Sequence, residues 1–197
     1  MPWEFFHEMG RKIIHITILI VLAFFFAIKN HAGQQAALLF LVGLLILFLI
    51  LEYFRLELNF KLPFFHQFIR PKEQYRIYCV IFFLSSTIIA FAVFDTAIAL
   101  AALLMTTFGD VAAAIAGKQY GTTLLFKNKT VVGFVSELTT NLIVAVAISL
   151  AFTINIYIPI IMAFVATITE TMVDELDDNL IVPVVSGFVG QLLVFLV

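Results

Sequence analysis

The chain has 197 residues, of which 63% are hydrophobic and 12% charged, and its formal net charge is −2. Most of the sequence consists of apolar runs near the length of about 20 residues that spans a bilayer core. The short polar connections that remain leave no room for a soluble domain. They also offer no exposed basic face, so we expect no nucleic-acid partner.

The apolar runs predict an all-α fold, a polytopic integral membrane helix bundle of about seven transmembrane helices. In chain order the runs are 13–28, 35–51, 77–94, 96–116, 134–153, 156–172 and 180–197. Because little chain is left outside them, we expect a single integral membrane domain over residues 1–197.

Threading the runs alternately through a bilayer places the N-terminus and the segments near 52–76, 109–133 and 170–179 on one face. All 11 Lys and Arg except Lys29 fall on that face, and the positive-inside rule makes it cytoplasmic. All 13 Asp and Glu except Asp95 also lie there, which the rule does not explain. Acids and bases gathered at one membrane surface predict a cytoplasmic site for an anionic, metal-bound ligand.

The first polar cluster lies in the sequence EMGRKIIH and contains Glu8, Arg11, Lys12 and His15. Glu8 with Lys12, and Arg11 with His15, are four residues apart, so a helix presents them on one face. Arg11 and Lys12 are therefore candidates for phosphate binding. His15 is a candidate general base about one turn below the membrane surface, or else a structural histidine.

The longest polar connection, residues 55–76, mixes basic residues with phenylalanines and two prolines. This composition is typical of an interfacial or re-entrant segment, which either anchors the chain at the membrane surface or guides a phosphate. Glu52 and Glu137 add polarity near the ends of apolar runs. Each is interpreted either as a partner of a nearby Arg or Lys that orients helices, or as a functional group.

Small residues recur at every fourth position in Gly109, Ala113, Gly117 and Gly121. On a helix they form a smooth stripe where a second backbone approaches closely, within the fold or in a homodimer. Asp110 lies beside the stripe, where a carboxylate is costly unless it is paired, hydrated or metal-bound. Asp110 is therefore a candidate catalytic and metal-binding residue.

A basic and hydroxyl-bearing turn follows, with Lys127, Lys129 and Thr130 ahead of the fifth apolar run. The turn suits the binding of nucleotide phosphates. Lys129 is also a candidate catalytic residue that takes up negative charge in a transition state. The alternative is an ordinary positive-inside loop.

The densest acidic cluster is ETMVDELDDN. Its candidate metal ligands are Glu170, Asp174, Asp177 and Asp178. Their spacing predicts one helical face, and acids at this density repel one another unless cations neutralise them. Oxygen ligands of this kind suit Mg²⁺, so we expect them to bind this metal together with Asp110. The alternative is a solvated acidic cap, in which Asp178 or Asn179 caps the next helix.

Four ordered motifs extend over nearly the whole chain and form a fairly specific pattern. They are E-x-x-R-K-x-x-H from Glu8 to His15, G-D-x-x-A-x-x-x-G-x-x-x-G from Gly109 to Gly121, K-T-x-x-G from Lys129 to Gly133, and E-x3-D-x2-D-D-N-x3-P from Glu170 to Pro183. The pattern resembles the family of dolichol kinase, phytol kinase and the CTP-dependent diacylglycerol kinases, often labelled phosphatidate cytidylyltransferase. Relatives often carry Glu, and Ser or Thr, where this chain has Val132 and Phe134.

The resemblance implies a membrane kinase that transfers the γ-phosphate of CTP to a lipid alcohol, such as a polyprenol, another isoprenoid alcohol or diacylglycerol, with a divalent metal. It implies that Asp110 and the segment from Asp174 to Asn179 hold metal and nucleotide, so Asn179 is a candidate nucleotide-binding residue. It also implies that Arg11, Lys12 and Lys129 bind phosphates. The expected partners are then a membrane lipid, a nucleoside triphosphate and the bilayer.

Two other functions fit parts of the pattern. A phosphatidate cytidylyltransferase would use the same metal and CTP to make a CDP-lipid. An ion-coupled transporter would use Glu52, Asp110 and Glu137 as an ion path, but the charges gather on one face and no inverted repeat is evident. No Walker A sequence or kinase glycine loop is present, so a nucleotide would bind by another architecture.

Overall fold

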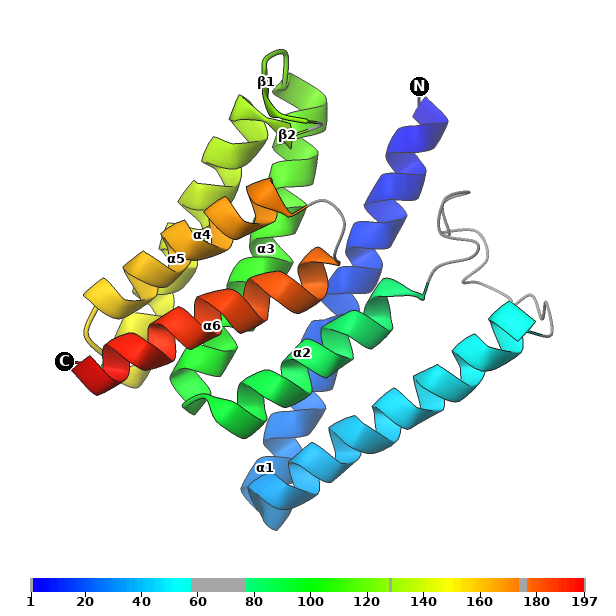
Figure 1. Ribbon diagram of the computed structural model, residues 1–197, viewed down its shortest axis with the longest axis vertical. Helices are drawn as coiled ribbons and strands as arrows, with labels where there is room; N and C mark the ends of the chain where they lie inside the picture. Colours follow the sequence, from blue (N-terminus) through cyan, green and yellow to red (C-terminus); the bar gives the residue numbers. More distant parts are fainter. Residues whose placement is uncertain (1, 58–76, 128, 174–176, 197) are drawn as a thin grey trace. The chain divides into compact units, whose positions relative to one another are not determined.

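The structure is a computed structural model that describes residues 2–57, 77–127, 129–173 and 177–196, with the helical backbone alone for residues 2–16 (Figure 1). The described residues form six helices and two short strands. These are α1 (Pro2–Glu57), α2 (Cys79–Val93), α3 (Thr96–Tyr120), β1 (Leu124–Phe126), β2 (Lys129–Thr130), α4 (Val131–Phe152), α5 (Tyr157–Met172) and α6 (Asp178–Leu196). The predicted all-α fold is confirmed, apart from a small unpredicted hairpin between α3 and α4.

Several helices have the length and composition of membrane spans. Four described segments are apolar and long enough to cross a bilayer: Thr17–Glu57, Thr96–Tyr120, Val131–Phe152 and Asp178–Leu196. Helices α2 and α5 are apolar but shorter. These helices indicate a multi-pass integral membrane protein. The number of seven spans and the cytoplasmic orientation stay predictions.

The chain divides into two compact units, Met1–Ser85 and Ser86–Val197, so a single membrane domain stays a prediction. In the first unit, α1 consists of two helical segments that meet at Gly33. The φ of Gly33 is +88°, in the left-handed region that glycine adopts without a steric penalty. The bend falls in the connection predicted between the first two apolar runs. The rings of Phe24 and Phe40 pack across it with centroids 6.4 Å apart.

An ion pair holds the end of α1. Arg55 donates from Nε to Oε2 of Glu52 at 2.8 Å and from Nη2 to Oε1 at 2.6 Å. The backbone N–H of Tyr78 donates to the same Oε1 at 2.8 Å. The interpretation of Glu52 as a partner of a nearby Arg is confirmed. The interfacial segment predicted over residues 55–76 lies mostly outside the described residues.

In the second unit, α3 packs against α4, α5 and α6 (Figure 1). A polar clasp joins the start of α3 to the end of α6. The backbone N–H of Asp95 donates to Oε1 of Gln191 at 2.7 Å, and Nε2 of Gln191 donates to Oδ2 of Asp95 at 3.2 Å. The clasp satisfies an otherwise orphaned N–H at the first turn of α3, and it fixes α6 relative to α3 at this end.

The glycine stripe of α3 contacts α4. A Cβ atom at Gly117 would lie 2.9 Å from Oγ1 of Thr130 and 3.6 Å from Cα of Gly133. A Cβ atom at Gly133 would lie 3.2 Å from the carbonyl oxygen of Ala113. The predicted stripe is therefore confirmed as a packing surface within the fold, where two helix backbones touch. A homodimer stays a prediction.

We expect Gly117→Ala to destabilise the protein by about 1–3 kcal/mol, because its Cβ would push Thr130 away from α3. Gly43→Ala is the control, since a Cβ there meets nothing within 4 Å. The measurement is the unfolding midpoint in detergent micelles. Equal midpoints for the two variants would contradict close packing of α3 on α4.

Candidate active site

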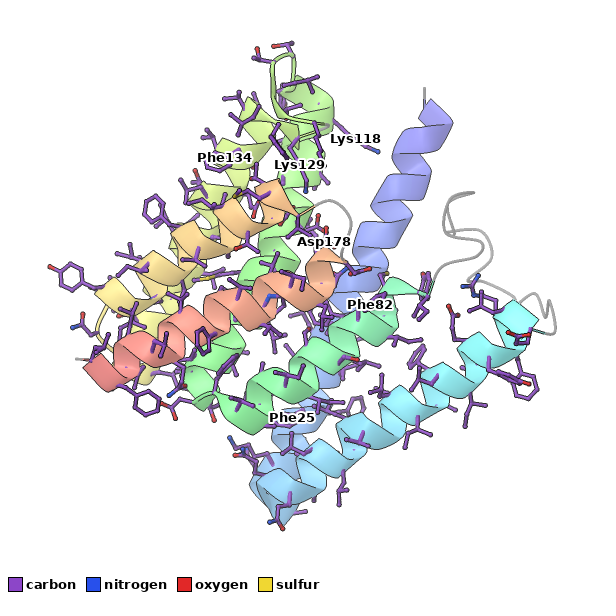
Figure 2. All side chains as sticks on the ribbon, viewed as in Figure 1. Phe25, Phe82, Lys118, Lys129, Phe134 and Asp178 are labelled. Carbon is purple, nitrogen blue, oxygen red and sulfur yellow. The ribbon has the colours of Figure 1, made fainter. Side chains whose placement is uncertain are left out.

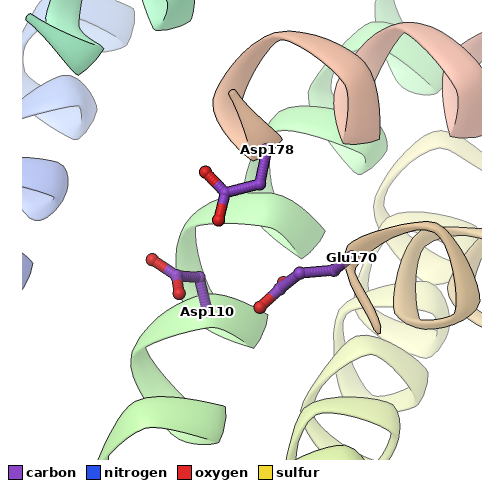
Figure 3. A group of neighbouring side chains, drawn as sticks. All are labelled: Asp110, Glu170 and Asp178. Carbon is purple, nitrogen blue, oxygen red and sulfur yellow. The ribbon is translucent and has the colours of Figure 1, made fainter. Parts of the chain in front are cut away.

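Three carboxyl groups from three helices meet in the second unit. Asp110 lies on α3, Glu170 near the end of α5 and Asp178 at the start of α6. One oxygen atom of each lies within 4.8 Å of the others, and Figure 3 shows the side chains turned toward one another. Glu170 is 1% exposed, whereas Asp110 and Asp178 are half-buried. We call these residues the carboxylate triad.

The carboxylate triad has the donor chemistry of a magnesium site. Charges so close repel one another strongly where water is largely excluded, and a divalent cation removes that repulsion. Mg²⁺ prefers oxygen ligands and usually combines a few carboxylates with water and substrate phosphates. Because Asp110 and Asp178 are partly open, ligands from solvent or substrate have access. The residues present therefore fit Mg²⁺.

Glu170 and Asp178 meet because the helix is interrupted between them. Helix α5 ends at Met172, and Val173 is extended, with φ −75° and ψ 130°. The next described helix, α6, begins at Asp178. The expectation that these acids share one helical face is therefore wrong. Because of this interruption, Glu170 and Asp178, which are close in sequence, approach Asp110 from two different helices. Asp174 lies outside the described residues.

Asp177 and Asn179 organise the first turn of α6. The N–H and Nδ2 of Asn179 donate to Oδ1 of Asp177 at 3.0 and 2.8 Å, and Nδ2 also donates to Oδ1 of Asp178 at 3.0 Å. The hydroxyl of Ser86 donates to the backbone oxygen of Asn179 at 2.7 Å. Asn179 is buried, and its hydrogen bond orients Asp178. Asp177 accepts hydrogen bonds as a helix cap does. Among the described residues, it is not one of the acids that lie close enough together to share a metal ion.

Lys129 supplies a cation beside the carboxylate triad. Its Nζ donates to Oε1 of Glu170 at 2.9 Å, and its side chain is 38% exposed. Burial lowers the pKa of Lys129, but the carboxylates of Glu170, Asp178 and Asp110 outweigh this effect and leave the pKa above its usual value. Lys129 is therefore protonated at neutral pH. The ammonium group of Lys129 compensates the charge of the buried Glu170, and part of the Lys129 side chain stays exposed to solvent.

The unpredicted hairpin explains how Lys129 is placed. Strands β1 and β2 are antiparallel, with Leu124 opposite Thr130 and Phe126 opposite Lys129. Oγ1 of Thr130 accepts the N–H of Gly133 at 3.1 Å and so caps α4. Lys127 lies at the exposed turn, with Nζ 5.6 Å from the ring centroid of Phe126. Figure 2 shows where Lys129 and Asp178 leave the ribbon.

Two further buried polar residues lie on α4 behind Glu170. Glu137 is 3% exposed, and its Cγ would lie 3.1 Å from a Cβ atom at Gly109, the residue before Asp110. Nδ2 of Asn141 donates to Oγ1 of Thr167 on α5 at 3.0 Å. From the sequence, Glu137 is expected to pair with a lysine or to belong to an ion path, whereas Asn141 is not predicted. The available signal was their four-residue spacing in an otherwise apolar helix.

The basic cluster of α1 belongs to the first unit. The backbone of Arg11, Lys12 and His15 is helical, but their side chains lie outside the described part of the structure. Their convergence with the carboxylate triad stays a prediction.

A comparison with models of known protein families identifies the family of the chain. Residues 4–174 match the model of the cytidylyltransferase family, and the chain belongs to that family. The family uses CTP and includes dolichol and phytol kinases as well as enzymes like those that make CDP-lipids. No curated protein and no solved structure matches the chain. The chain is therefore a CTP-using transferase with several membrane-length helices.

We expect Mn²⁺ or Mg²⁺ to raise the unfolding temperature of the protein in detergent. The gain in stability is about 2.7 kcal/mol when the metal concentration is 100-fold above Kd. Asp178→Asn should unfold at a higher temperature than the wild type without metal, because one repulsive charge is gone, and should gain less on metal addition. Asp95→Asn, at the other end of α3, is the control. An equal metal response in Asp178→Asn would argue against a site at the carboxylate triad.

Proposed function

We propose that the protein is a CTP-dependent lipid kinase that transfers the γ-phosphate of CTP to the hydroxyl of a membrane lipid alcohol. The acceptor is a polyprenol such as dolichol, another isoprenoid alcohol or diacylglycerol. The observation that carries the proposal is the meeting of Asp110, Glu170 and Asp178 beside Lys129, on three apolar helices. The four ordered motifs favour the kinase branch of the family, which uses the same donor and similar lipids.

The carboxylate triad would hold Mg²⁺, which supplies charge neutralisation to the triphosphate. Transfer of a phosphoryl group needs mainly positioning and stabilisation of charge on its oxygens. Lys129 is protonated and adjacent, so it stabilises negative charge that develops on those oxygens. The hydroxyl of Thr130 accepts one hydrogen bond as a helix cap and still has its own hydrogen to donate to a phosphate.

The lipid hydroxyl would arrive from the bilayer, along the apolar helices that surround the site. Half-buried Asp110 lies where the buried and open parts of the site meet, and it would accept the hydroxyl proton. His15 is the alternative acceptor. A loose transition state places little demand on this base. Arg11, Lys12 and Lys127 would bind outlying phosphate oxygens, and Asn179 would fix Asp178 against the nucleotide.

A second candidate is a phosphatidate cytidylyltransferase, and the description of the matched family favours it. The departures at Val132 and Phe134 from the pattern of the relatives leave the choice between the two reactions open. A phosphate oxygen of phosphatidate would attack the α-phosphorus of CTP, and pyrophosphate would leave. Because both reactions need the same metal and nucleotide, the carboxylate triad serves either one. An ion-coupled transporter does not fit a family of CTP-using transferases.

CTP labelled separately at the α- and γ-phosphates distinguishes the two reactions. Purified protein would be incubated in detergent with Mg²⁺, a pool of lipid alcohols and phosphatidate. We expect γ-label in the lipid product and CDP as the other product. Transfer of α-label with release of pyrophosphate would instead establish the cytidylyltransferase. Transfer of neither label would contradict both.

In the same assay we expect Asp110→Asn to lower the rate at saturating CTP by about 10²–10³-fold, since a charge that organises the transition state is lost. Asp95→Asn removes a charge at the N-cap of the same helix but keeps a side-chain oxygen that can accept from Gln191, so it should leave the rate unchanged. Unaltered phosphorylation by Asp110→Asn would remove this residue from the mechanism.

A further inference from the structure

Helix α6 lacks one of its own hydrogen bonds close to its first turn. Pro183 lies inside the helix, and a proline has no N–H to donate to the carbonyl oxygen four residues earlier. That oxygen belongs to Asn179, which is 4% exposed. A buried carbonyl group that finds no other donor is costly, because water does not reach it. Pro183 also closes the motif that begins at Glu170, and it has no place among the groups that would hold metal or phosphate.

Ser86 of α2 supplies the missing donor. Its hydroxyl donates to the backbone oxygen of Asn179 at 2.7 Å, and its side chain is fully buried. The adjacent Ser85 instead donates to the carbonyl oxygen of Ile81 in its own helix, at 2.8 Å, which is the local bond open to a serine within a helix. Side chains of Ser and Thr are among the groups that satisfy backbone oxygens freed by prolines in membrane helices. The bond from Ser86 therefore compensates for Pro183.

One buried face of α6 carries this contact and two others. Its residues recur at every fourth position, and they are Asn179, Pro183, Gly187 and Gln191. A Cβ atom at Gly187 would collide with the ring of Phe94, and the clasp joins the last residue of the face to the start of α3. Ser86 and Phe94 are eight residues apart, as are their two partners on α6. Residues 86–94 therefore run parallel to α6 in a defined register.

Asn179 connects this face to the candidate metal site. Its Nδ2 donates to Oδ1 of Asp178 at 3.0 Å, and Asp178 belongs to the carboxylate triad. A displacement of the backbone at Asn179 would move its amide group and the adjacent carboxylate together. One oxygen atom of each triad residue lies within 4.8 Å of the others, so such a displacement would change the spacing that a metal ion requires.

We propose that Ser86 is a positioning residue, which replaces the hydrogen bond that Pro183 removes and so holds Asp178 in place within the carboxylate triad. Ser86 itself touches neither metal nor substrate. Residues that orient metal ligands typically change metal affinity about 10–100-fold when they are replaced. The inference rests on the proposed function only for the reaction that the site performs, because metal affinity does not depend on which phosphate of CTP reacts.

The experiment is a Mn²⁺ titration of the full chain in detergent, in which electron paramagnetic resonance measures the free ion. Ser86→Ala should weaken Mn²⁺ binding about 10-fold, the lower end of the range, because Ser86 acts through Asn179. Ser85→Ala is the matched control and should keep the wild-type affinity, since its hydroxyl donates within α2. Ser86→Cys has a weak donor of similar size. It should also weaken binding, and it decides the question if the alanine variant does not fold.

A change at Pro183 identifies the cause of the loss. Pro183→Ala gives residue 183 an N–H that can donate to the oxygen of Asn179, so the hydroxyl of Ser86 is no longer needed there. We expect the double variant Ser86→Ala/Pro183→Ala to bind Mn²⁺ as tightly as Pro183→Ala alone. A hydroxyl that only contributed to packing would be missed equally in both backgrounds.

The outcomes separate this inference from the proposed function. Wild-type affinity in Ser86→Ala or Ser86→Cys would overturn the inference and leave the proposed function intact. Equal weakening by Ser86→Ala with and without Pro183 would also overturn it, because the oxygen of Asn179 would then not be the cause. A wild-type protein that binds no Mn²⁺ would overturn both. Failure to transfer either label from CTP, with the expected Mn²⁺ affinities, would contradict the proposed function alone.

Discussion

The buried charge of Glu170 is the constraint on which the rest of the second unit depends. A carboxylate that is 1% exposed is costly unless opposite charge and hydrogen bonds compensate it. The chain supplies a cation from the hairpin, because Nζ of Lys129 donates to Oε1 of Glu170. Asp110 and Asp178 leave an excess of negative charge beside Glu170, and a bound metal ion would neutralise it. Helix packing and the balance of charge thus both place the candidate metal site at Glu170.

The sequence predicts those features of the fold that depend on local periodicity. Apolar runs of membrane length locate the helices, and the four-residue recurrence from Gly109 locates the surface that contacts α4. Asp110 and Asp178 are recognisable because ionised groups are rare in apolar surroundings and need a reason. The predicted basic turn coincides in position with the observed hairpin, whereas its role in phosphate binding stays a prediction. Its Lys129 faces Glu170, which is forty-one residues away in the chain.

Features that depend on packing between helices are not predictable in this way. Continuous helical spacing suggested one face for Glu170 and Asp178, but the helix ends at Met172, and helix ends are set by tertiary contacts as much as by propensity. The partner of Asn141 lies on α5, so no spacing within α4 identifies it. The strands of the hairpin are too short for a periodic signal.

The clasp between Asp95 and Gln191 has a mechanical consequence. About 22 Å of helix α3 separates Asp95 from Asp110, and about 20 Å of α6 separates Gln191 from Asp178. The two helices are therefore hinged at one end and carry opposing carboxylates at the other. A tilt of α6 by about 10° around that point would displace Asp178 by about 3.5 Å. The clasp, although far from the carboxylate triad, would therefore help to set the distance between two of its members.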